Sequence, residues 1–148
     1  MLIETGLPRP GSAFELKGAG DYVTATDRRS EAAILEVLAR EAPGVAVLAE
    51  EGGGLRASTM WTVDPLDGTT NFTRGFPTVA VSVALLDSGL PAVGVVLAPF
   101  LGLEFVAARA LSSMAIVCRS IGRSTRRARW SRQAFRFATR SCCPAICR

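Results

Sequence analysis

The chain of 148 residues contains no histidine. A Ser-His catalytic triad and a zinc site built on histidine are therefore excluded. Long apolar runs are missing as well, because none reaches the roughly 18 residues that span a bilayer. The first residues lack a basic segment followed by an apolar stretch, so we predict no signal peptide. These absences favour a cytoplasmic protein with no membrane partner.

Acidic residues are absent after Glu104. Residues 1–110 hold all 13 acidic residues and 8 of the 17 basic ones, whereas residues 111–148 hold nine arginines and no lysine or acid. All four cysteines lie in the second segment, at positions Cys118, Cys142, Cys143 and Cys147. The chain thus divides near Ala110 into a domain, 1–110, and an Arg/Cys-rich tail, 111–148.

The arginines of the tail recur without a helical or strand period, so we predict that residues 111–148 are irregular or disordered. A run of this composition that starts abruptly is typical of translation in a shifted frame of a GC-rich gene. The alternative is a genuine basic arm for nucleic acid or an anionic membrane. We do not expect nucleic acid as a partner. The cysteine spacing matches no standard zinc pair and favours unspecified thiols.

The domain itself shows one helical and several strand patterns. Ile34, Leu35 and Leu38 share one face of a predicted helix over about 28–41, which Asp27 or Ser30 could cap and on which Glu31 can stay solvated. Pro43-Gly44 ends this helix. Strands are predicted at 45–49, 59–64, 78–86, 92–97 and 103–107. This order favours an α+β fold with an antiparallel sheet and a packed helix.

The segment Asp64-Pro65-Leu66-Asp67-Gly68-Thr69-Thr70-Asn71-Phe72 follows one of these strands. It places two carboxylates three residues apart, with a Gly-Thr-Thr turn after them. Clustered oxygen ligands suit Mg²⁺, and the exposed N–H groups of such a turn suit a phosphate. An ordinary turn is the alternative, but it does not need this set of residues in this order. The segment therefore indicates phosphoryl chemistry.

Glu50 and Glu51 stand at the end of another predicted strand. If the two strands are neighbours, Glu50 meets Asp64 and Asp67 at one edge of the sheet. Crowded carboxylates repel, and a shared cation is the natural way to hold them. The alternative is that the two glutamates form a solvated loop.

Three pieces of the chain together resemble the inositol monophosphatase family of Mg²⁺-dependent sugar-phosphate phosphatases. They are Lys17 to Asp27, the Glu50-Glu51 pair with its following glycines, and the Asp64 to Phe72 motif with Gly75-Phe76-Pro77 after it. The resemblance covers roughly 95 residues, about the family's N-terminal portion. It implies the N-terminal lobe of a layered α/β/α/β/α fold.

The resemblance also implies roles for individual residues. Glu50, Asp64, Asp67 and the Leu66 carbonyl look like Mg²⁺ ligands. Thr69, with Glu50, would orient and activate the attacking water, which gives Glu50, Asp67 and Thr69 catalytic roles.

The same resemblance implies a phosphate site and a surrounding set of residues. The phosphate site would be formed by Leu66, Asp67, Gly68 and Thr69, with the N–H groups of the last two in contact with the phosphate. Asp27 and Glu51 would lie behind the metal ligands or at a weaker metal site. Lys17 would be a positive neighbour of the site, although an ordinary surface lysine is an equal alternative.

The implied activity is Mg²⁺-dependent hydrolysis of inositol phosphate or a related small sugar or alcohol phosphate. The family's second half supplies a further Asp after a Trp, but here Trp130 is followed by Ser131. We therefore expect impaired activity, which a partner in a homodimer could complete. The alternatives are an inactive remnant that at most binds metal and a basic-tailed nucleic-acid-binding protein.

Overall fold

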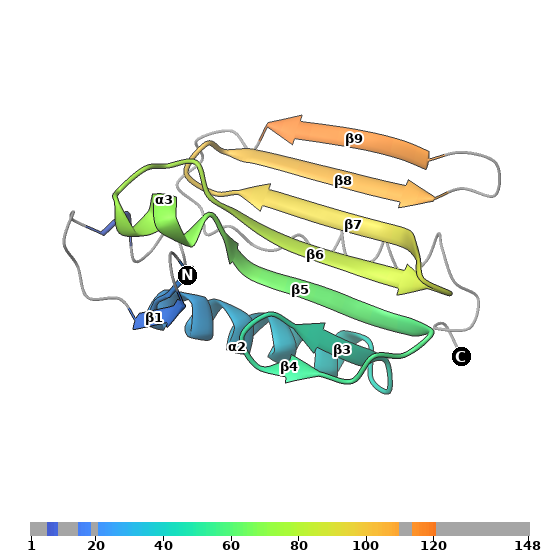
Figure 1. Cartoon of the computed structure of the whole chain (residues 1–148). Helices are drawn as coiled ribbons and strands as arrows, with labels where there is room; N and C mark the ends of the chain where they lie inside the picture. Colours follow the sequence, from blue (N-terminus) through green and yellow to red (C-terminus); the bar gives the residue numbers. More distant parts are fainter. Residues whose placement is uncertain (1–5, 9–14, 19–20, 110–113, 121–148) are drawn as a thin grey trace.

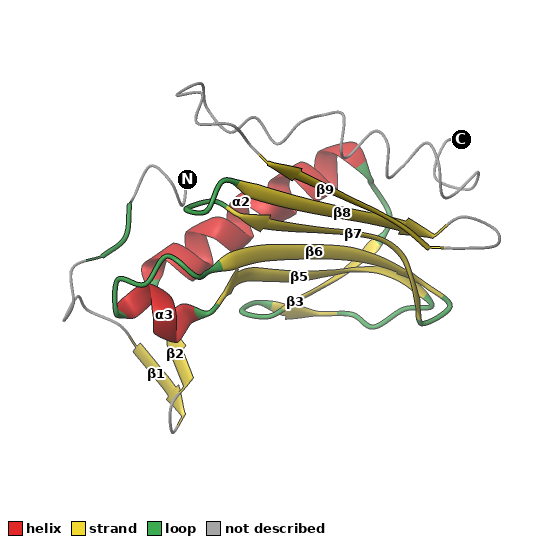
Figure 2. Ribbon diagram, turned by 90° about the horizontal axis from the view of Figure 1, so that it is seen from above, coloured by secondary structure: helices red, strands yellow, loops and turns green. Residues whose placement is uncertain are grey.

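The computed structural model describes residues 6–8, 15–18, 21–109 and 114–120. In this part of the chain a seven-stranded sheet has the strand order β4-β3-β5-β6-β7-β8-β9, and helix α2 crosses one of its faces (Figures 1 and 2). A two-stranded hairpin and the short helix α3 lie at one end. The elements are β1 (Glu15–Gly18), β2 (Asp21–Val23), α2 (Ala25–Glu41), β3 (Ala46–Ala49), β4 (Gly53–Gly54), β5 (Thr59–Asp67), α3 (Thr69–Thr73), β6 (Ala80–Asp87), β7 (Leu90–Ala98), β8 (Leu103–Arg109) and β9 (Met114–Ser120).

The α+β class is confirmed, but the prediction of an antiparallel sheet is wrong at one pair of strands. β3 and β5 run parallel, and the other neighbouring strands run antiparallel. The short strand β4 turns back along β3, and this extra reversal lets β5 run in the same direction as β3. Gly54 makes the return possible, since a Cβ there would lie 2.1 Å from the Val47 carbonyl oxygen. The mixed sheet therefore depends on a glycine loop that strand periodicity does not reveal.

Helix α2 begins at Ala25, three residues before the predicted start, and its cap is Thr24 rather than Asp27 or Ser30. The Thr24 hydroxyl accepts hydrogen bonds from the N–H groups of Thr26 at 3.1 Å and Asp27 at 3.4 Å. Asp27 completes a capping box by accepting from the Thr24 N–H at 2.9 Å. The first turn of α2 is thus fixed by the same aspartate that the sequence assigns to the site.

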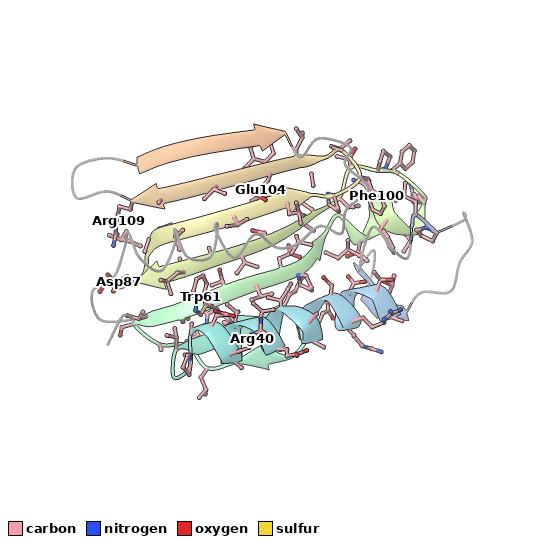
Figure 3. All side chains as sticks on the ribbon, turned by 180° about the vertical axis from the view of Figure 1, so that it is seen from behind. Arg40, Trp61, Asp87, Phe100, Glu104 and Arg109 are labelled. Carbon is pink, nitrogen blue, oxygen red and sulfur yellow. The ribbon has the colours of Figure 1, made fainter. Side chains whose placement is uncertain are left out.

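The hydrophobic core lies between α2 and the sheet. Ile34 and Leu38 of the helix belong to one buried cluster with side chains of β5 and β6, including Trp61 and Leu85. Trp61 points from β5 toward α2 (Figure 3). Alternate residues of β6, from Val81 to Leu85, are buried, as expected for a strand with one covered face.

The opposite face of the sheet carries the other alternate residues. Asp64, Ser82, Val96 and Phe105 are cross-strand partners in turn across β5, β6, β7 and β8, so their side chains share this face. Val96 is 37% exposed and Phe105 is 38% exposed. This face therefore combines an acidic group at one end with exposed apolar side chains further along.

The prediction of an irregular tail is wrong for part of the segment 111–148. Strand β9 lies within it and pairs antiparallel with β8 over Leu103 to Arg109. The apolar residues from Met114 to Val117 supply a strand pattern that the surrounding arginines obscure. The zinc and thiol alternatives for Cys142, Cys143 and Cys147 lie outside the described residues. None of the described helices is long and apolar enough to cross a membrane.

An ion pair connects the ends of two strands, β8 and β6. Arg109 at the end of β8 lies 3.6 Å from the carboxylate of Asp87 at the end of β6 (Figure 3). Thr59 at the start of β5 donates to the same carboxylate at 3.3 Å. Asp87 therefore links strand ends at the end of the sheet opposite to the candidate site.

Candidate metal and phosphate site

The parallel pairing of β3 and β5 brings Glu50 and Asp64 together. Ala49 pairs with Val63, and the Glu50 N–H donates to the Val63 carbonyl at 3.0 Å. The next residues along each strand, Glu50 and Asp64, are therefore neighbours, and their side chains form a hydrogen bond.

The surroundings of Asp64 disfavour its ionised form. Burial is the largest cause that raises the pKa of Asp64, and the charges of Asp67 and Asp27 raise it further. The hydrogen bonds from Glu50 and from the Leu66 N–H, the latter at 3.1 Å, act in the opposite direction. A carboxyl group with a raised pKa beside other acids is typical of a site that gains stability when a cation arrives.

An open pocket of about 370 Å³ lies over this acidic pair. The pocket is lined by residues of β3, β5 and β6 and by Glu50, which directly follows β3. The lining residues are Leu48, Ala49, Glu50, Thr62, Val63, Asp64 and Ser82. The pocket lies on the sheet face opposite α2, because Asp64 and Ser82 pair across that face. Both carboxyl groups are thus reachable from solvent.

The strand β5 becomes irregular after Asp64. Its pairing with β6 shifts between Asp64 and Asp67, and the intervening Pro65 and Leu66 are buried. Asp67 is exposed at the end of the strand. Gly68 then takes a left-handed conformation with φ of 87°, and a Cβ there would lie 3.1 Å from the Thr78 carbonyl oxygen. The motif thus needs glycine at this turn into α3.

Thr69 connects this turn to the start of α2. Its hydroxyl lies 3.0 Å from Asp27 Oδ1 and 3.0 Å from the Leu66 carbonyl oxygen. A hydroxyl has one proton, so these two acceptors compete for it. Asp27 is 2% exposed, which places a buried carboxylate directly behind Thr69.

The remaining residues predicted around the site differ in how closely the structure connects them to it. Glu51 is half-buried, and its N–H donates to Glu31 Oε2 at 2.8 Å. The prediction that Glu31 is solvated is wrong, since its side chain is 5% exposed. Lys17 lies on β1, and its side chain is outside the described part of the molecule.

Two residues near the site were not predicted. Glu31 and Ser30 both lie on α2, and Ser30 donates to the Pro65 carbonyl at 2.9 Å. Their position four and three residues after Asp27 puts all three on one helix face. That spacing is the sequence signal that could have found them, had the helix start been placed at Ala25.

The donor set of the site is made of oxygen. In the ranges that the structure describes, no group of three or more Asp, Glu, His or Cys side chains converges closely enough to hold a metal ion. The pair Glu50 and Asp64 is together, while Asp67 acts on Asp64 through its charge. Two neighbouring carboxyl groups in an open pocket that water can enter fit a hard cation such as Mg²⁺, which keeps several water ligands.

Comparison with known proteins identifies relatives of the chain. Inositol-1-monophosphatase of Synechocystis sp. is 48% identical over 98 residues, which are 64% of this chain and 34% of that protein. Histidinol-phosphatase of Mycobacterium tuberculosis is 47% identical over 97 residues, which are 64% of this chain and 37% of that protein. Nus factor SuhB of Pasteurella multocida is 43% identical over 97 residues, which are 64% of this chain and 36% of that protein.

Solved structures agree with these relatives. The inositol monophosphatase from Anabaena (Nostoc) sp. superposes with a TM-score of 0.58 at 42% identity, over 64% of this chain and 38% of that one. The Thermotoga maritima IMPase superposes with a TM-score of 0.65 at 32% identity, over 71% of this chain and 41% of that one. The chain therefore spans a third to two fifths of the length of the relatives that it matches. The family model described as the inositol monophosphatase family matches residues 2–136, which extends past Ala110. The chain belongs to the inositol monophosphatase family.

Proposed function

We propose that the chain is the metal- and phosphate-binding lobe of a Mg²⁺-dependent phosphate monoester hydrolase. Its substrate class is inositol phosphate or a related small sugar or alcohol phosphate. The neighbouring carboxyl groups of Glu50 and Asp64, at the mouth of an open pocket, are the observation that carries this proposal. Relatives named inositol-1-monophosphatase and histidinol-phosphatase support the alcohol phosphate class.

Glu50, Asp64, Asp67 and the Leu66 carbonyl oxygen are the proposed ligands of Mg²⁺. All four are oxygen donors, and three of them lie within four residues of one strand end. Burial and, to a smaller extent, the charges of Asp67 and Asp27 raise the pKa of Asp64, and a bound cation would offset both effects. When bound, Mg²⁺ supplies neutralisation of the phosphate and of the leaving oxygen.

Thr69 is the proposed residue that orients the attacking water. When Asp27 Oδ1 accepts the Thr69 proton, the Thr69 oxygen is free to accept a hydrogen bond from water. Glu50 is the proposed second acceptor for that water. The two acceptors together would hold the water in one orientation and take up its proton, which is the positioning that phosphoryl transfer requires.

The backbone N–H groups of Gly68 and Thr69 are the proposed phosphate contacts, beside Leu66 and Asp67. The left-handed Gly68 turns the chain from β5 into α3 within one residue. Successive N–H groups in such a turn form a concave donor surface for anions. Glu51 and Lys17 remain proposed neighbours of the site.

The activity of the chain itself is proposed to be low. The reason for this proposal is that the chain matches only 34–37% of the length of the curated relatives compared above. A homodimer remains our prediction for how a site could be completed, and a cytoplasmic location remains a prediction. We expect no nucleic-acid partner. Nus factor SuhB is the name of relatives of the chain and is not a statement about the chain itself.

Phosphate release from inositol 1-phosphate tests the proposal. The unaltered chain is expected to release phosphate slowly and only with Mg²⁺, and Asp67→Asn is expected to abolish the release. Glu36→Gln is the matched control, since Glu36 is exposed on α2 away from the site. Equal release by the unaltered chain and Asp67→Asn would contradict the proposed role. No release together with no affinity for Mn²⁺, used as a probe for Mg²⁺, would overturn the proposed function.

A further inference from the structure

The first two turns of α2 carry three buried polar side chains on one face. Asp27 is 2% exposed, Ser30 is 4% exposed and Glu31 is 5% exposed. Their spacing of three and four residues places them side by side. Burial of a carboxylate is costly unless it is hydrogen-bonded. The partners of these residues therefore indicate what the burial achieves.

Glu31 uses both carboxylate oxygens on the loop that follows β3. Oε2 accepts from the Glu51 N–H at 2.8 Å, and Oε1 accepts from the Gly52 N–H at 2.8 Å. Two consecutive amides bound by one carboxylate fix the peptide that leaves Glu50. Because the Glu50 N–H also donates to the Val63 carbonyl at 3.0 Å, the backbone is anchored on both sides of Glu50.

Ser30 holds the other acidic segment. Its hydroxyl donates to the carbonyl of Pro65, the residue after Asp64, at 2.9 Å. Ser30 and Glu31 are adjacent in α2, so a single rigid turn of helix anchors the backbone beside Asp64 and beside Glu50. The relative position of the two carboxyl groups is thus set from behind by α2.

The local packing favours a carboxylate at position 31. A Cβ on Gly52 would lie 2.9 Å from Glu31 Oε1, so glycine lets the loop approach the carboxylate. A glutamine at position 31 offers one oxygen and one NH₂ group, and the NH₂ group cannot accept from a backbone N–H. One of the two loop contacts would then be lost.

We propose that Glu31 is a positioning residue that holds Glu50 against Asp64 for the divalent cation. It touches neither the cation nor the substrate, and it acts through the backbone of Glu51 and Gly52. This inference rests on the proposed function, because it assigns a purpose to the geometry of the pair.

The test combines Mn²⁺ affinity with amide hydrogen exchange in the metal-free protein. Residues that orient metal ligands typically change affinity 10- to 100-fold when altered. We expect Glu31→Gln to weaken Mn²⁺ binding about 10-fold and to speed exchange at the amides of Glu51 and Gly52. Glu36→Gln, an exposed change on the same helix, should alter neither quantity. Circular dichroism confirms that each variant is folded at the temperature used.

The outcomes separate the two proposals. If the unaltered chain binds Mn²⁺ and Glu31→Gln binds it equally well, the positioning role is overturned while the proposed function stands. If the unaltered chain binds no Mn²⁺, the proposed function fails and the role falls with it, even where the loop amides are protected. Should Glu31→Gln fail to fold, Gly52→Ala replaces it, because the added methyl group displaces the Glu31 carboxylate. Unchanged affinity in that variant would equally overturn the role.

Discussion

Asp64→Asn should have opposite effects on stability and on metal binding. Burial and the nearby charges of Asp67 and Asp27 raise the pKa of Asp64 in the folded chain. A carboxyl group with a raised pKa stabilises the fold at pH below its unfolded value of about 3.9, and this contribution is lost as the pH rises through the folded value. At neutral pH the ionised Asp64 is therefore unfavourable. Asparagine removes that cost.

The expected gain in the free energy of unfolding is modest. Asp64 is half-buried, so solvent screens part of its interaction with Asp67 and Asp27. Relief of such surface repulsion typically stabilises a protein by about 0.5–1 kcal/mol, which corresponds to roughly 2–6 °C in melting temperature for a domain of this size. Asparagine keeps an oxygen that can accept from the Leu66 N–H, a contact of 3.1 Å in the unaltered chain.

Magnesium should reverse the order of the two proteins. A cation at ten times its Kd stabilises the folded chain by about 1.4 kcal/mol. The unaltered chain should gain this amount and Asp64→Asn should gain little of it. Asp87→Asn is the matched control, because Asp87 pairs with Arg109 at 3.6 Å and its loss should lower the melting temperature slightly.

Thermal melts at pH 7 with and without Mg²⁺ measure these differences. The reasoning is refuted if Asp64→Asn melts below the unaltered chain without metal. It is equally refuted if that variant keeps the full upward shift with Mg²⁺. If Asp87→Asn raises the melting temperature as much as Asp64→Asn does, removing any acidic residue stabilises the chain and the effect is not specific to Asp64.

Three further predictions concern the fold. Thr24→Ala should cost about 1 kcal/mol of unfolding free energy, because the capping box with Asp27 is lost; urea denaturation checks this, and a change under 0.3 kcal/mol would contradict it. Leu85→Ala should cost about 2–5 kcal/mol, because Leu85 is 1% exposed in the core; an unchanged denaturation midpoint would contradict this. The exposed side chains of Val96 and Phe105 should promote self-association, so Phe105→Gln should shift the sedimentation of the chain toward monomer, and identical sedimentation of both proteins would argue against this face.

Much of the sheet could be predicted from the sequence because its strands keep a period of two. The alternation from Val81 to Leu85 follows from one covered face, and the turn at Asp87-Ser88-Gly89 separates β6 from β7 as expected. The parallel pairing of β3 with β5 could not be predicted from periodicity. It depends on a two-residue strand, Gly53–Gly54, which has no side chains to show a pattern.

The candidate site divides in the same way. Glu50 and Asp64 could be paired from the sequence because each follows a strand and like charges need a common partner. Glu31 could not, because a glutamate among other polar helix residues reads as solvent-exposed until the helix start is known. Its burial depends on the loop at Glu51 and Gly52, twenty residues further along the chain.

The tail shows where composition misleads. Nine arginines without acids predict irregular structure, yet Met114–Ser120 forms a strand against β8. Composition averages over a segment, whereas a strand needs only a few apolar residues beside an unpaired edge. The origin of the tail stays a prediction, and sequencing of the gene across codons 108–112 would test the shifted frame.

Paramagnetic broadening by Mn²⁺ tests the central claim most directly. Small additions of Mn²⁺ to the ¹⁵N-labelled chain should first broaden the amide signals of Glu50, Asp64, Leu66 and Asp67, with inorganic phosphate extending the effect to Gly68 and Thr69. The account is contradicted if these signals stay sharp, or if broadening centres on Asp87 and Glu104 instead.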